Sequence, residues 1–195
     1  MYIVKISDKK LISLIKNGGV GILPTDTLYG LVGLTSNKKT VARIYRLKKR
    51  TPLKPCIILI SSISDLKNFS VKINPKDKKL LTKIWPGKVS IVLPCSSKKF
   101  FYLHRGTKSL AFRLPKKKIL IQILKKTGPL LAPSANWEGF LPAKNITEAK
   151  KYFGDKIDFY VNGGKLKSKP STIVLLNNGK IKVLRPGAFK IKNPA

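Results

Sequence analysis

The chain has 195 residues, of which 43% are hydrophobic, and this size suits one compact domain with its own core. A single histidine and only eight carboxylates exclude a histidine-rich metal centre and leave little for a carboxylate metal cage. No stretch approaches the roughly 20 apolar residues that span a bilayer, and the N-terminus lacks a signal-peptide pattern. Cys56 and Cys95 lack nearby cysteines, which indicates neither a disulfide framework nor a zinc site. Together these features predict a cytoplasmic protein without membrane contact.

The basic residues are mostly lysine. Lysine and arginine number 41 and give a formal net charge of +33, yet only six of them are arginine, which leaves 35 lysines. Arginine is the residue that forks onto phosphates and bases, whereas lysine acts as a point charge. The lysine-rich surface therefore has two explanations, which are selected binding of nucleic acid such as tRNA, or drift in an AT-rich genome. Charge alone does not decide between them.

Strand and helix patterns alternate along the chain. Asp8 and Asn37 are placed as N-caps, and Asn178-Gly179 is typical of a hairpin turn. The patterns predict helices over 8–17, 37–49, 75–84, 117–127 and 146–153, and strands over 2–6, 20–23, 56–60, 89–93, 109–114, 130–132, 159–162, 172–176 and 180–184. This alternation, without repeats or linkers, predicts one α/β domain over residues 1–195 with a mixed β-sheet and flanking helices.

Several kinds of catalysis are excluded by the absence of their motifs. The sequence contains neither the P-loop pattern nor G-x-G-x-x-G, and nothing around His104 forms a nucleophile elbow. Any catalysis must then use cations, hydroxyls and backbone amides. Such groups suit the positioning of phosphates and the stabilisation of charge.

Two segments carry polar groups that need an explanation. Pro24–Gly30 follows a predicted strand and contains two threonines and Asp26, which could orient a polar ligand or could simply form a capped turn. On the helix over 37–49, Lys48 shares one face with Val41, Ile44 and Tyr45. A lysine on the apolar face needs an anion or must reach an edge, whereas Lys49 is explained by its place at the helix C-terminus.

Three later segments add candidate ligands. In the strand over 109–114, Ser109 and Arg113 share one face, and the opposite face is apolar. An arginine there suggests recognition of carboxylate or phosphate, although an exposed sheet face would also explain it. Ser134 and Asn136 follow a short apolar strand, where they either bind a ligand or form an ordinary turn. Arg185 shares its strand face with Ile181 and Val183, and it projects toward a shared site or simply ends the strand.

Taken together and in this order, the segments resemble the YrdC-like family of threonylcarbamoyl-AMP synthases. The matching pieces span residues 10 to 190 and are Pro24–Gly30, Lys48–Arg50, Pro55–Ile60, Trp85–Gly87, Leu110–Leu114, Pro133–Asn136, Ser171–Val174 and Leu184–Gly187. Each piece alone is weak evidence for the family. Eight pieces that occur in the same order and spacing are a strong signal. The resemblance implies a twisted mixed sheet with flanking helices around a basic cavity.

The resemblance also implies the reaction and its partners. Threonine and bicarbonate or carbon dioxide give a carbamate, which attacks the α-phosphorus of ATP and releases pyrophosphate. ATP is thus a substrate, and Mg²⁺ arrives with it rather than in a protein metal site. Separate threonylcarbamoyl-transferase proteins would then use the adenylate to modify the tRNA adenosine beside the anticodon.

The residue roles follow from the same resemblance. Lys48 and Arg50 match catalytic positions, and Thr27 and Arg113 match positions that hold threonine. The positions that line the ATP site correspond here to Lys48, Arg50, Lys54, Ser109, Ser134, Asn136 and Arg185.

This sequence departs from the family pattern at several positions. Asp26 stands where glutamate is common, Thr51 where proline usually follows the Lys-x-Arg motif, and Pro142 where some longer members have serine. Leu59 stands where some members have histidine, which leaves part of threonine binding without an assigned residue. The resemblance therefore predicts the short form of the family, without the extra C-terminal domain of those longer members.

Two other functions remain open. A non-catalytic RNA-binding protein of the same fold would explain the +33 charge. Retention of Lys48, Arg50, Ser134 and Asn136 argues against it, because an RNA binder needs no nucleotide pocket. A different carbamoyl transfer that does not use threonine is the third interpretation.

Overall fold

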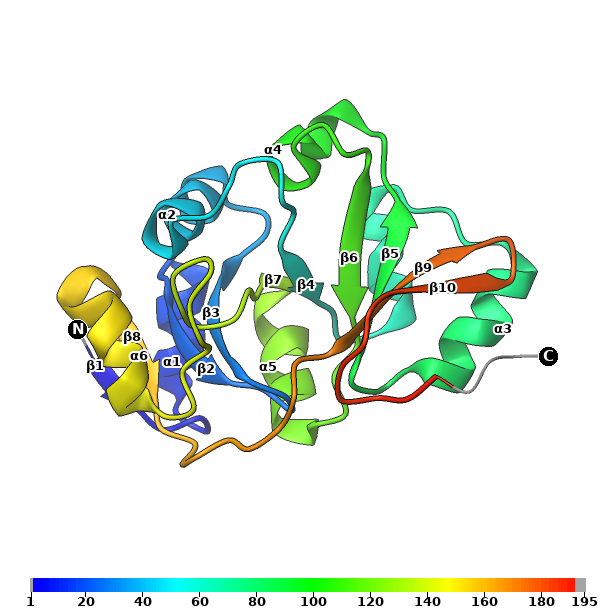
Figure 1. Ribbon diagram of the computed structural model, residues 1–195. Helices are drawn as coiled ribbons and strands as arrows, with labels where there is room; N and C mark the ends of the chain where they lie inside the picture. Colours follow the sequence, from blue (N-terminus) through cyan, green and yellow to red (C-terminus); the bar gives the residue numbers. More distant parts are fainter. Residues whose placement is uncertain (1, 192–195) are drawn as a thin grey trace.

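Ten strands form one mixed sheet in the computed structural model, which describes residues 2–191 (Figure 1). The strands are β1 (Tyr2–Val4), β2 (Gly21–Pro24), β3 (Tyr29–Leu34), β4 (Ile57–Leu59), β5 (Val89–Pro94), β6 (Ser109–Arg113), β7 (Leu130–Leu131), β8 (Phe159–Val161), β9 (Thr172–Asn177) and β10 (Lys180–Arg185). Their order across the sheet is β1-β8-β2-β3-β7-β4-β6-β5-β9-β10. The sheet contains both parallel pairs, such as β4 with β6, and antiparallel pairs, such as β5 with β6. The predicted α/β domain with a mixed sheet is confirmed.

Four of the longer helices begin at side-chain caps, two of which, Asp8 and Asn37, are predicted from the sequence. The helices are α1 (Lys9–Lys16), α2 (Lys38–Lys48), α3 (Pro75–Ile84), α4 (Phe101–His104), α5 (Lys118–Thr127) and α6 (Ile146–Phe153), with 3₁₀ helices η1 (Ile63–Phe69), η2 (Lys98–Phe100) and η3 (Gly154–Lys156). The side chains of Asp8, Asn37, Asn74 and Asn145 accept a backbone N–H from the first turn of α1, α2, α3 and α6. These side chains therefore fix where four helices start.

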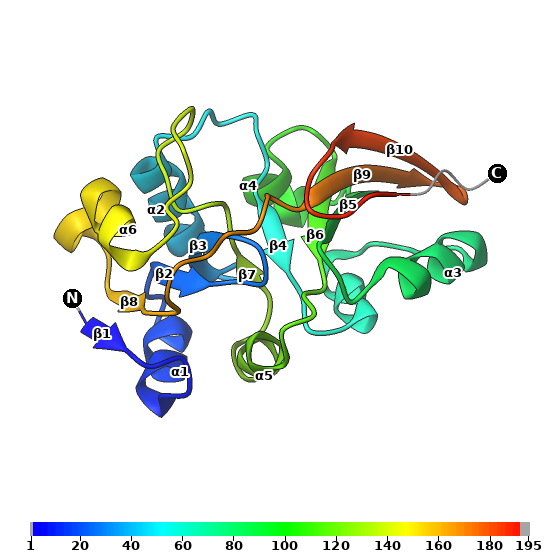
Figure 2. The same ribbon diagram turned by 60° about the horizontal axis from the view of Figure 1, so that its bottom comes forward.

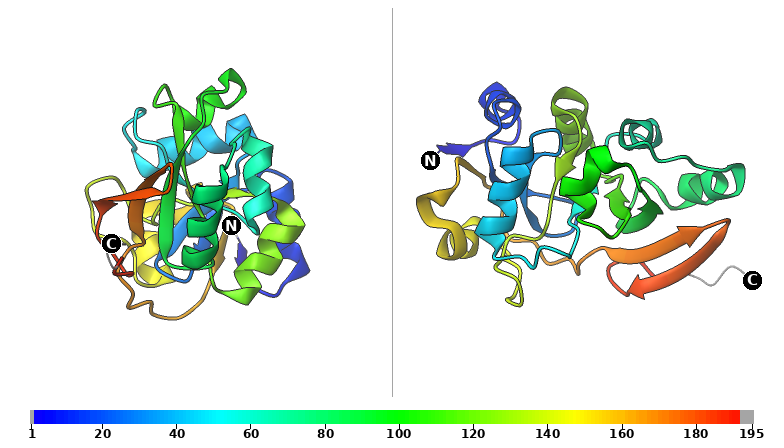
Figure 3. Two further views of the ribbon diagram at one scale, coloured as in Figure 1. Left: turned by 90° about the vertical axis from the view of Figure 1, so that its right-hand side faces the viewer. Right: turned by 90° about the horizontal axis from the view of Figure 1, so that it is seen from above.

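Helices cover the sheet on both faces. On one face, α1 and α5 place Leu11, Ile15 and Leu120 in a core cluster with residues of β1, β2 and β8. On the other face, α2 contributes Val41 and Ile44 to a larger cluster. Seen from above, α1 and α5 lie on one side of the sheet, and the loop over 137–142 and the segment over 162–170 lie on the opposite side (Figure 3).

Strand β3 is present in the structure but is not predicted from the sequence, and this is the main difference between the two. It pairs antiparallel with β2, from Gly21 with Val32 to Pro24 with Tyr29, so residues 25–28 form the turn of a hairpin. Two glycines in β3 weaken its sequence signal. Gly33 is needed there because a Cβ atom would collide with the Thr40 side chain of α2. The short elements η1, η2, η3 and α4 also carry no clear periodicity, and the sequence does not predict them.

The other predicted elements match closely. The helices over 75–84 and 146–153 have the predicted bounds, and the Asn178-Gly179 turn joins β9 to β10. Among residues 2–191, no helix combines the length and apolar character that crossing a bilayer requires.

Candidate functional site

A cavity of about 540 Å³ lies among the polar segments singled out in the sequence. Its volume lies in the range typical of sites for small molecules and cofactors. Seven segments distant in the sequence line it, and the lining residues are Thr25, Thr27, Leu28, Tyr29, Gly30, Lys48, Arg50, Pro55, Cys56, Ile57, Val92, Thr107, Ser109, Ala111, Arg113, Ala132, Pro133, Ser134, Asn136, Phe140, Pro142, Pro170, Ser171, Ile173, Leu184 and Arg185. Every site residue expected from the sequence is among them except Lys54. Within the described part of the chain, the lining residues include four cations and no carboxylate.

Arg113 lies at the floor of the cavity with Thr27. Ser109, Ala111 and Arg113 face the cavity from β6, and Leu110 and Phe112 are buried in the core, as strand alternation predicts. Nη1 of Arg113 donates to Oγ1 of Thr27 at 2.6 Å. The two predicted threonine-site residues are therefore in direct contact.

The charge of Arg113 is incompletely compensated. Its side chain is 5% exposed and forms an ion pair with Asp26, with Nη2 3.3 Å from Oδ1. Both Nε of Arg113 and Oδ1 of Asp26 are buried without a hydrogen-bond partner in the described structure. Burial lowers the pKa of the Arg113 guanidinium, and the Asp26 carboxylate opposes that shift. A buried guanidinium with an unused N–H at a cavity wall is suited to bind a carboxylate.

Lys48 joins the C-terminal end of α2 to the loop over 134–136. Its residue is 3% exposed, which confirms that it follows the apolar face of α2. Nζ donates to the backbone oxygens of Ser134 at 2.8 Å and Asn136 at 3.1 Å, and it also contacts Oδ1 of Asn136 at 3.1 Å and Oγ of Ser134 at 3.3 Å. Burial and the neighbouring charge of Arg50 lower the pKa of Lys48 to about 8. The ammonium group thus fixes the shape of the Ser134–Asn136 loop.

Arg50 and Arg185 keep donors available toward the cavity. Nε and Nη2 of Arg50 donate to the backbone oxygens of Lys54 and Pro55 at 2.8 and 3.0 Å, and Nη2 of Arg185 donates to the backbone oxygen of Ser171 at 2.8 Å. A guanidinium has five N–H donors, so each retains unused ones. Burial and the charge of Arg50 lower the pKa of Arg185. This concentration of positive charge is suited to polyphosphate.

A β-bulge affects the position of Arg185. The pairing of β10 with β9 shifts between Val183 and Arg185. Arg185 therefore does not continue the strand alternation through Ile181 and Val183, and the prediction that these three side chains share a face is wrong. The bulge lets both Leu184 and Arg185 line the cavity.

Lys54 lies outside the cavity lining. Its ammonium group contacts Oε1 of Glu138 at 2.9 Å, and its side chain is 61% exposed. Oε2 of Glu138 accepts the backbone N–H of Thr51 at 2.5 Å. Proline at position 51 would lack this N–H, so the departure from the family pattern has a structural consequence. Hydrogen bonds from Lys54 and Thr51 lower the pKa of Glu138 to about 2.

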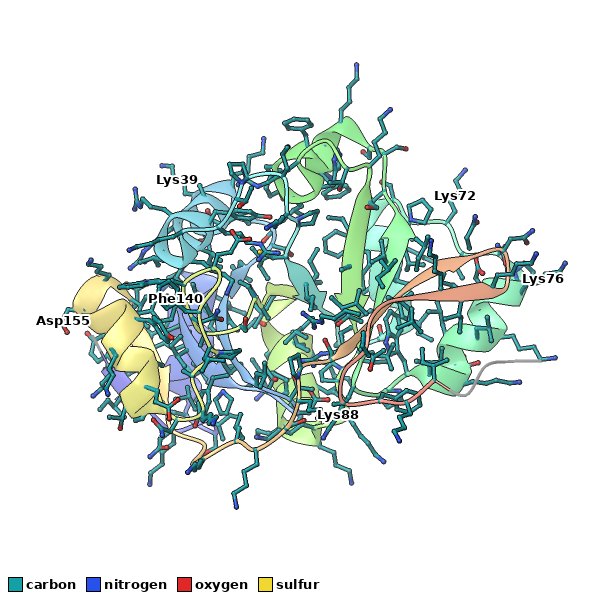
Figure 4. The ribbon with its side chains drawn as sticks, in the orientation of Figure 1. Lys39, Lys72, Lys76, Lys88, Phe140 and Asp155 are labelled. Atoms are coloured by element: carbon teal, nitrogen blue, oxygen red, sulfur yellow. The ribbon has the colours of Figure 1, made fainter. Side chains whose placement is uncertain are left out.

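Glu138 therefore links the loop that contains Arg50, Thr51 and Lys54 to the loop over 137–142. The two loops lie side by side in Figure 2. We expect Glu138→Ala to weaken the binding of inorganic triphosphate to the cavity about fivefold, because a surface contact of this kind is worth about 1 kcal/mol. Asp155→Ala is the matched control, since it removes one negative charge at the far edge of the molecule (Figure 4). Equal affinities of the two variants for triphosphate would contradict this role.

Three contributors to the site are not predicted from the sequence. Glu138 and Phe140 lie in a loop whose conformation depends on Lys48, and no local pattern marks them. The Tyr29 hydroxyl donates to the backbone oxygen of Gly164 at 2.7 Å and accepts the N–H of Gly163 at 2.8 Å. Because the partners are 134 and 135 positions away, only the fold reveals this anchor. Across residues 2–191, His, Cys, Asp and Glu form no group of three or more with metal-binding geometry.

Comparisons with known proteins cover most of this chain. The family model Sua5_yciO_yrdC, described as "Telomere recombination", matches residues 13–187. A putative threonylcarbamoyl-AMP synthase from Methanocaldococcus jannaschii is 31% identical over 96% of this chain and 90% of its own length. The threonylcarbamoyl-AMP synthase of Bacillus subtilis is 30% identical over 91% of this chain, which covers 52% of that protein.

Solved structures of related proteins are also similar to this chain over most of its length. The crystal structure of Pyrococcus abyssi Sua5 complexed with L-threonine superposes with a TM-score of 0.84 at 29% identity, over 91% of this chain and 53% of that one. This chain therefore spans about half the length of the P. abyssi protein. Escherichia coli YciO superposes with a TM-score of 0.83 at 24% identity, over 94% and 90% of the two chains, and supports the fold alone. The chain belongs to the Sua5/YciO/YrdC family, whose relatives include threonylcarbamoyl-AMP synthases.

Proposed function

We propose that this chain is an L-threonylcarbamoyladenylate synthase, which makes threonylcarbamoyl-AMP and pyrophosphate from L-threonine, bicarbonate or CO₂, and ATP. The observation that carries the proposal is the meeting of two kinds of site in one cavity. A buried guanidinium suited to an amino-acid carboxylate lies in the same 540 Å³ cavity as Lys48, Arg50 and Arg185, which suit a triphosphate.

The threonine end of the site is formed by Arg113 and Thr27. The unpartnered Nε of Arg113 offers a hydrogen bond to the carboxylate of threonine. The single hydrogen of the Thr25 hydroxyl goes to the backbone oxygen of Leu28 at 2.6 Å, so the Thr27 hydroxyl donates to Thr25 at 3.2 Å. Thr27 therefore presents only acceptor capacity to a ligand. The L-threonine bound by the P. abyssi relative fits this assignment.

The phosphate end of the site positions the reaction. Threonine's amine and CO₂ give a carbamate, and a carbamate oxygen attacks the α-phosphorus. The new O–P bond forms as the bond from the α-phosphorus to the bridging oxygen breaks, and pyrophosphate leaves with the electron pair. Arg50 and Arg185 offset the charge on the phosphates, and Ser109 and Ser134 supply hydroxyls. Holding both substrates in line supplies much of the rate.

Mg²⁺ enters with ATP in this proposal and is held by phosphate oxygens, since carboxylates are absent from the described cavity lining. Downstream threonylcarbamoyl-transferase proteins would consume the adenylate to modify tRNA. The two free buried cysteines fit a reducing cytoplasm. Lys54 stays a proposed ATP ligand, which must leave Glu138 to reach a phosphate.

Pyrophosphate release tests the proposal. We expect the purified chain to release pyrophosphate from ATP only when L-threonine and bicarbonate are both present. Omission of either one should reduce the rate to background.

The charge of +33 favours a second candidate, a non-catalytic RNA-binding protein. That function predicts no pyrophosphate release, together with tight RNA binding that weakens steeply as salt increases. Release that needs bicarbonate but not threonine would instead indicate a different carbamoyl transfer.

A further inference from the structure

Phe140 is an aromatic side chain at the cavity that the reaction described above does not use. It lies on the loop over 137–142, lines the cavity and is 59% exposed (Figure 4). Tyr29, the other aromatic residue among the described lining residues, is fully buried. A large apolar ring left open at the wall of a ligand cavity is a candidate contact for the ligand.

Neighbouring aromatic rings hold Phe140 in place. The centroid of its ring lies 5.9 Å from that of Trp137 with an interplanar angle of 89°, and 6.4 Å from that of Tyr152 with an angle of 69°. The Tyr152 hydroxyl also donates to the backbone oxygen of Leu141 at 2.9 Å. The ring is thus supported from the protein side by edge-to-face contacts, although more than half of the side chain stays exposed.

The same polar network that contains Lys48 sets the position of this ring. Nδ2 of Asn136 donates to the backbone oxygens of Trp137 and Phe140, both at 2.7 Å, and Oδ1 of Asn136 contacts Nζ of Lys48 at 3.1 Å. Phe140 is therefore held in register with the cations of the cavity. A ligand that has both a charged and a flat apolar part matches this arrangement.

We propose that Phe140 is the stacking surface for the purine base of the nucleotide. The inference rests on the proposed function, which brings ATP into the cavity. The triphosphate is attracted to Arg50 and Arg185, but the neutral base gains nothing from these charges and needs an apolar face. Phe140 and Pro142 supply such a face in the lining. Stacking of a base on an aromatic ring is worth enough to change affinity about tenfold or more.

Binding of two ligands separates base recognition from phosphate recognition. ATP and inorganic triphosphate share the phosphates, and only ATP has the base. Binding can be followed by the fluorescence of Trp137, which contacts Phe140, since the other tryptophan, Trp85, is buried in the core. We expect Phe140→Ala to weaken ATP binding about tenfold and to change triphosphate binding less than twofold. Phe140→Tyr should restore ATP binding.

Leu141→Ala is the matched control, because Leu141 is 82% exposed beside Phe140 but does not line the cavity. Unchanged ATP affinity in Phe140→Ala overturns the inference, and so does an equal loss for both ligands, which would mean that the ring only supports the loop. A loss at Leu184→Ala with none at Phe140→Ala would move the base to the opposite wall. If the wild-type chain binds neither ligand, the proposed function itself fails.

Discussion

Arg113→Ala should lower the threonine-dependent kcat/KM of pyrophosphate release by about 100-fold or more. The side chain is buried, contacts Thr27 at 2.6 Å and keeps Nε unpaired at the cavity. Loss of one partner from a buried, charge-assisted contact costs about 2–5 kcal/mol, and about 2.7 kcal/mol corresponds to 100-fold. We expect the KM for threonine to carry most of the effect and ATP affinity to change little. Arg113→Lys keeps the charge but loses the planar fork, so it should recover only part of the activity.

Arg46→Ala is the matched control for Arg113, because Arg46 is an exposed arginine on α2. It should behave as the wild type, and thermal unfolding of each variant shows whether the fold is intact. Threonine-dependent turnover within a few-fold of wild type in folded Arg113→Ala would remove the threonine site from this part of the cavity.

Lys48→Ala should reduce kcat/KM for ATP by about 100-fold. The substitution removes an ammonium group that contacts four oxygens of Ser134 and Asn136 and so releases the loop that forms one wall of the cavity. Breaking a buried charged network costs about 3–5 kcal/mol in comparable cases. Lys49→Ala is the neighbouring control. The Lys49 ammonium lies 3.7 Å from the centre of the Trp137 ring, an exposed contact worth about 0.5–1 kcal/mol, so its loss should change the rate less than fivefold.

The lowered pKa of Lys48 gives this prediction a pH dependence. In the free protein its ammonium group loses a proton as the pH rises through about 8, so kcat/KM for ATP should fall above that pH. Bound triphosphate favours the charged form, and the corresponding fall in kcat should therefore lie at higher pH. The Lys48→Met variant should not show this fall in kcat/KM for ATP above about pH 8. Lys48 lies on the apolar face of α2, and from this we predicted that Lys48 rather than Lys49 serves the site. Equal effects of Lys48→Ala and Lys49→Ala would contradict that prediction.

Local periodicity predicted much of the fold and the direction in which several side chains of the candidate site point. The inward direction of Lys48 follows from its spacing to Val41 and Ile44, and the cavity face of Ser109 and Arg113 follows from strand alternation. These rules work because each depends only on the geometry of one element. The caps at Asp8 and Asn37 were predictable for the same reason.

Features that depend on contacts between distant segments were not predictable. Gly33 of β3 has its reason in the packing of Thr40, and the bulge that turns Leu184 and Arg185 into the cavity arises from pairing with β9. Lys54 follows the Lys-x-Arg motif closely in sequence but contacts Glu138, 84 positions away. Leu59 illustrates the same limit, since it pairs in register with Arg113 yet is fully buried in the core behind the cavity. Among the described residues that line the cavity, none is a histidine that could take the place of the one found in some family members at the position of Leu59.

The central claim is that one cavity joins threonine, a one-carbon unit and AMP, and identification of the product tests it most directly. The purified chain is incubated with ATP, L-threonine and bicarbonate that carries a heavy carbon isotope, and the nucleotides are separated at once and analysed by mass spectrometry. The account predicts a new adenylate that contains both threonine and the labelled carbon, formed at similar rates by the wild type and by Arg46→Ala but about 100-fold more slowly by Arg113→Ala at low threonine concentration. An adenylate without the label, or no adenylate from a folded wild-type chain that binds ATP, would contradict it.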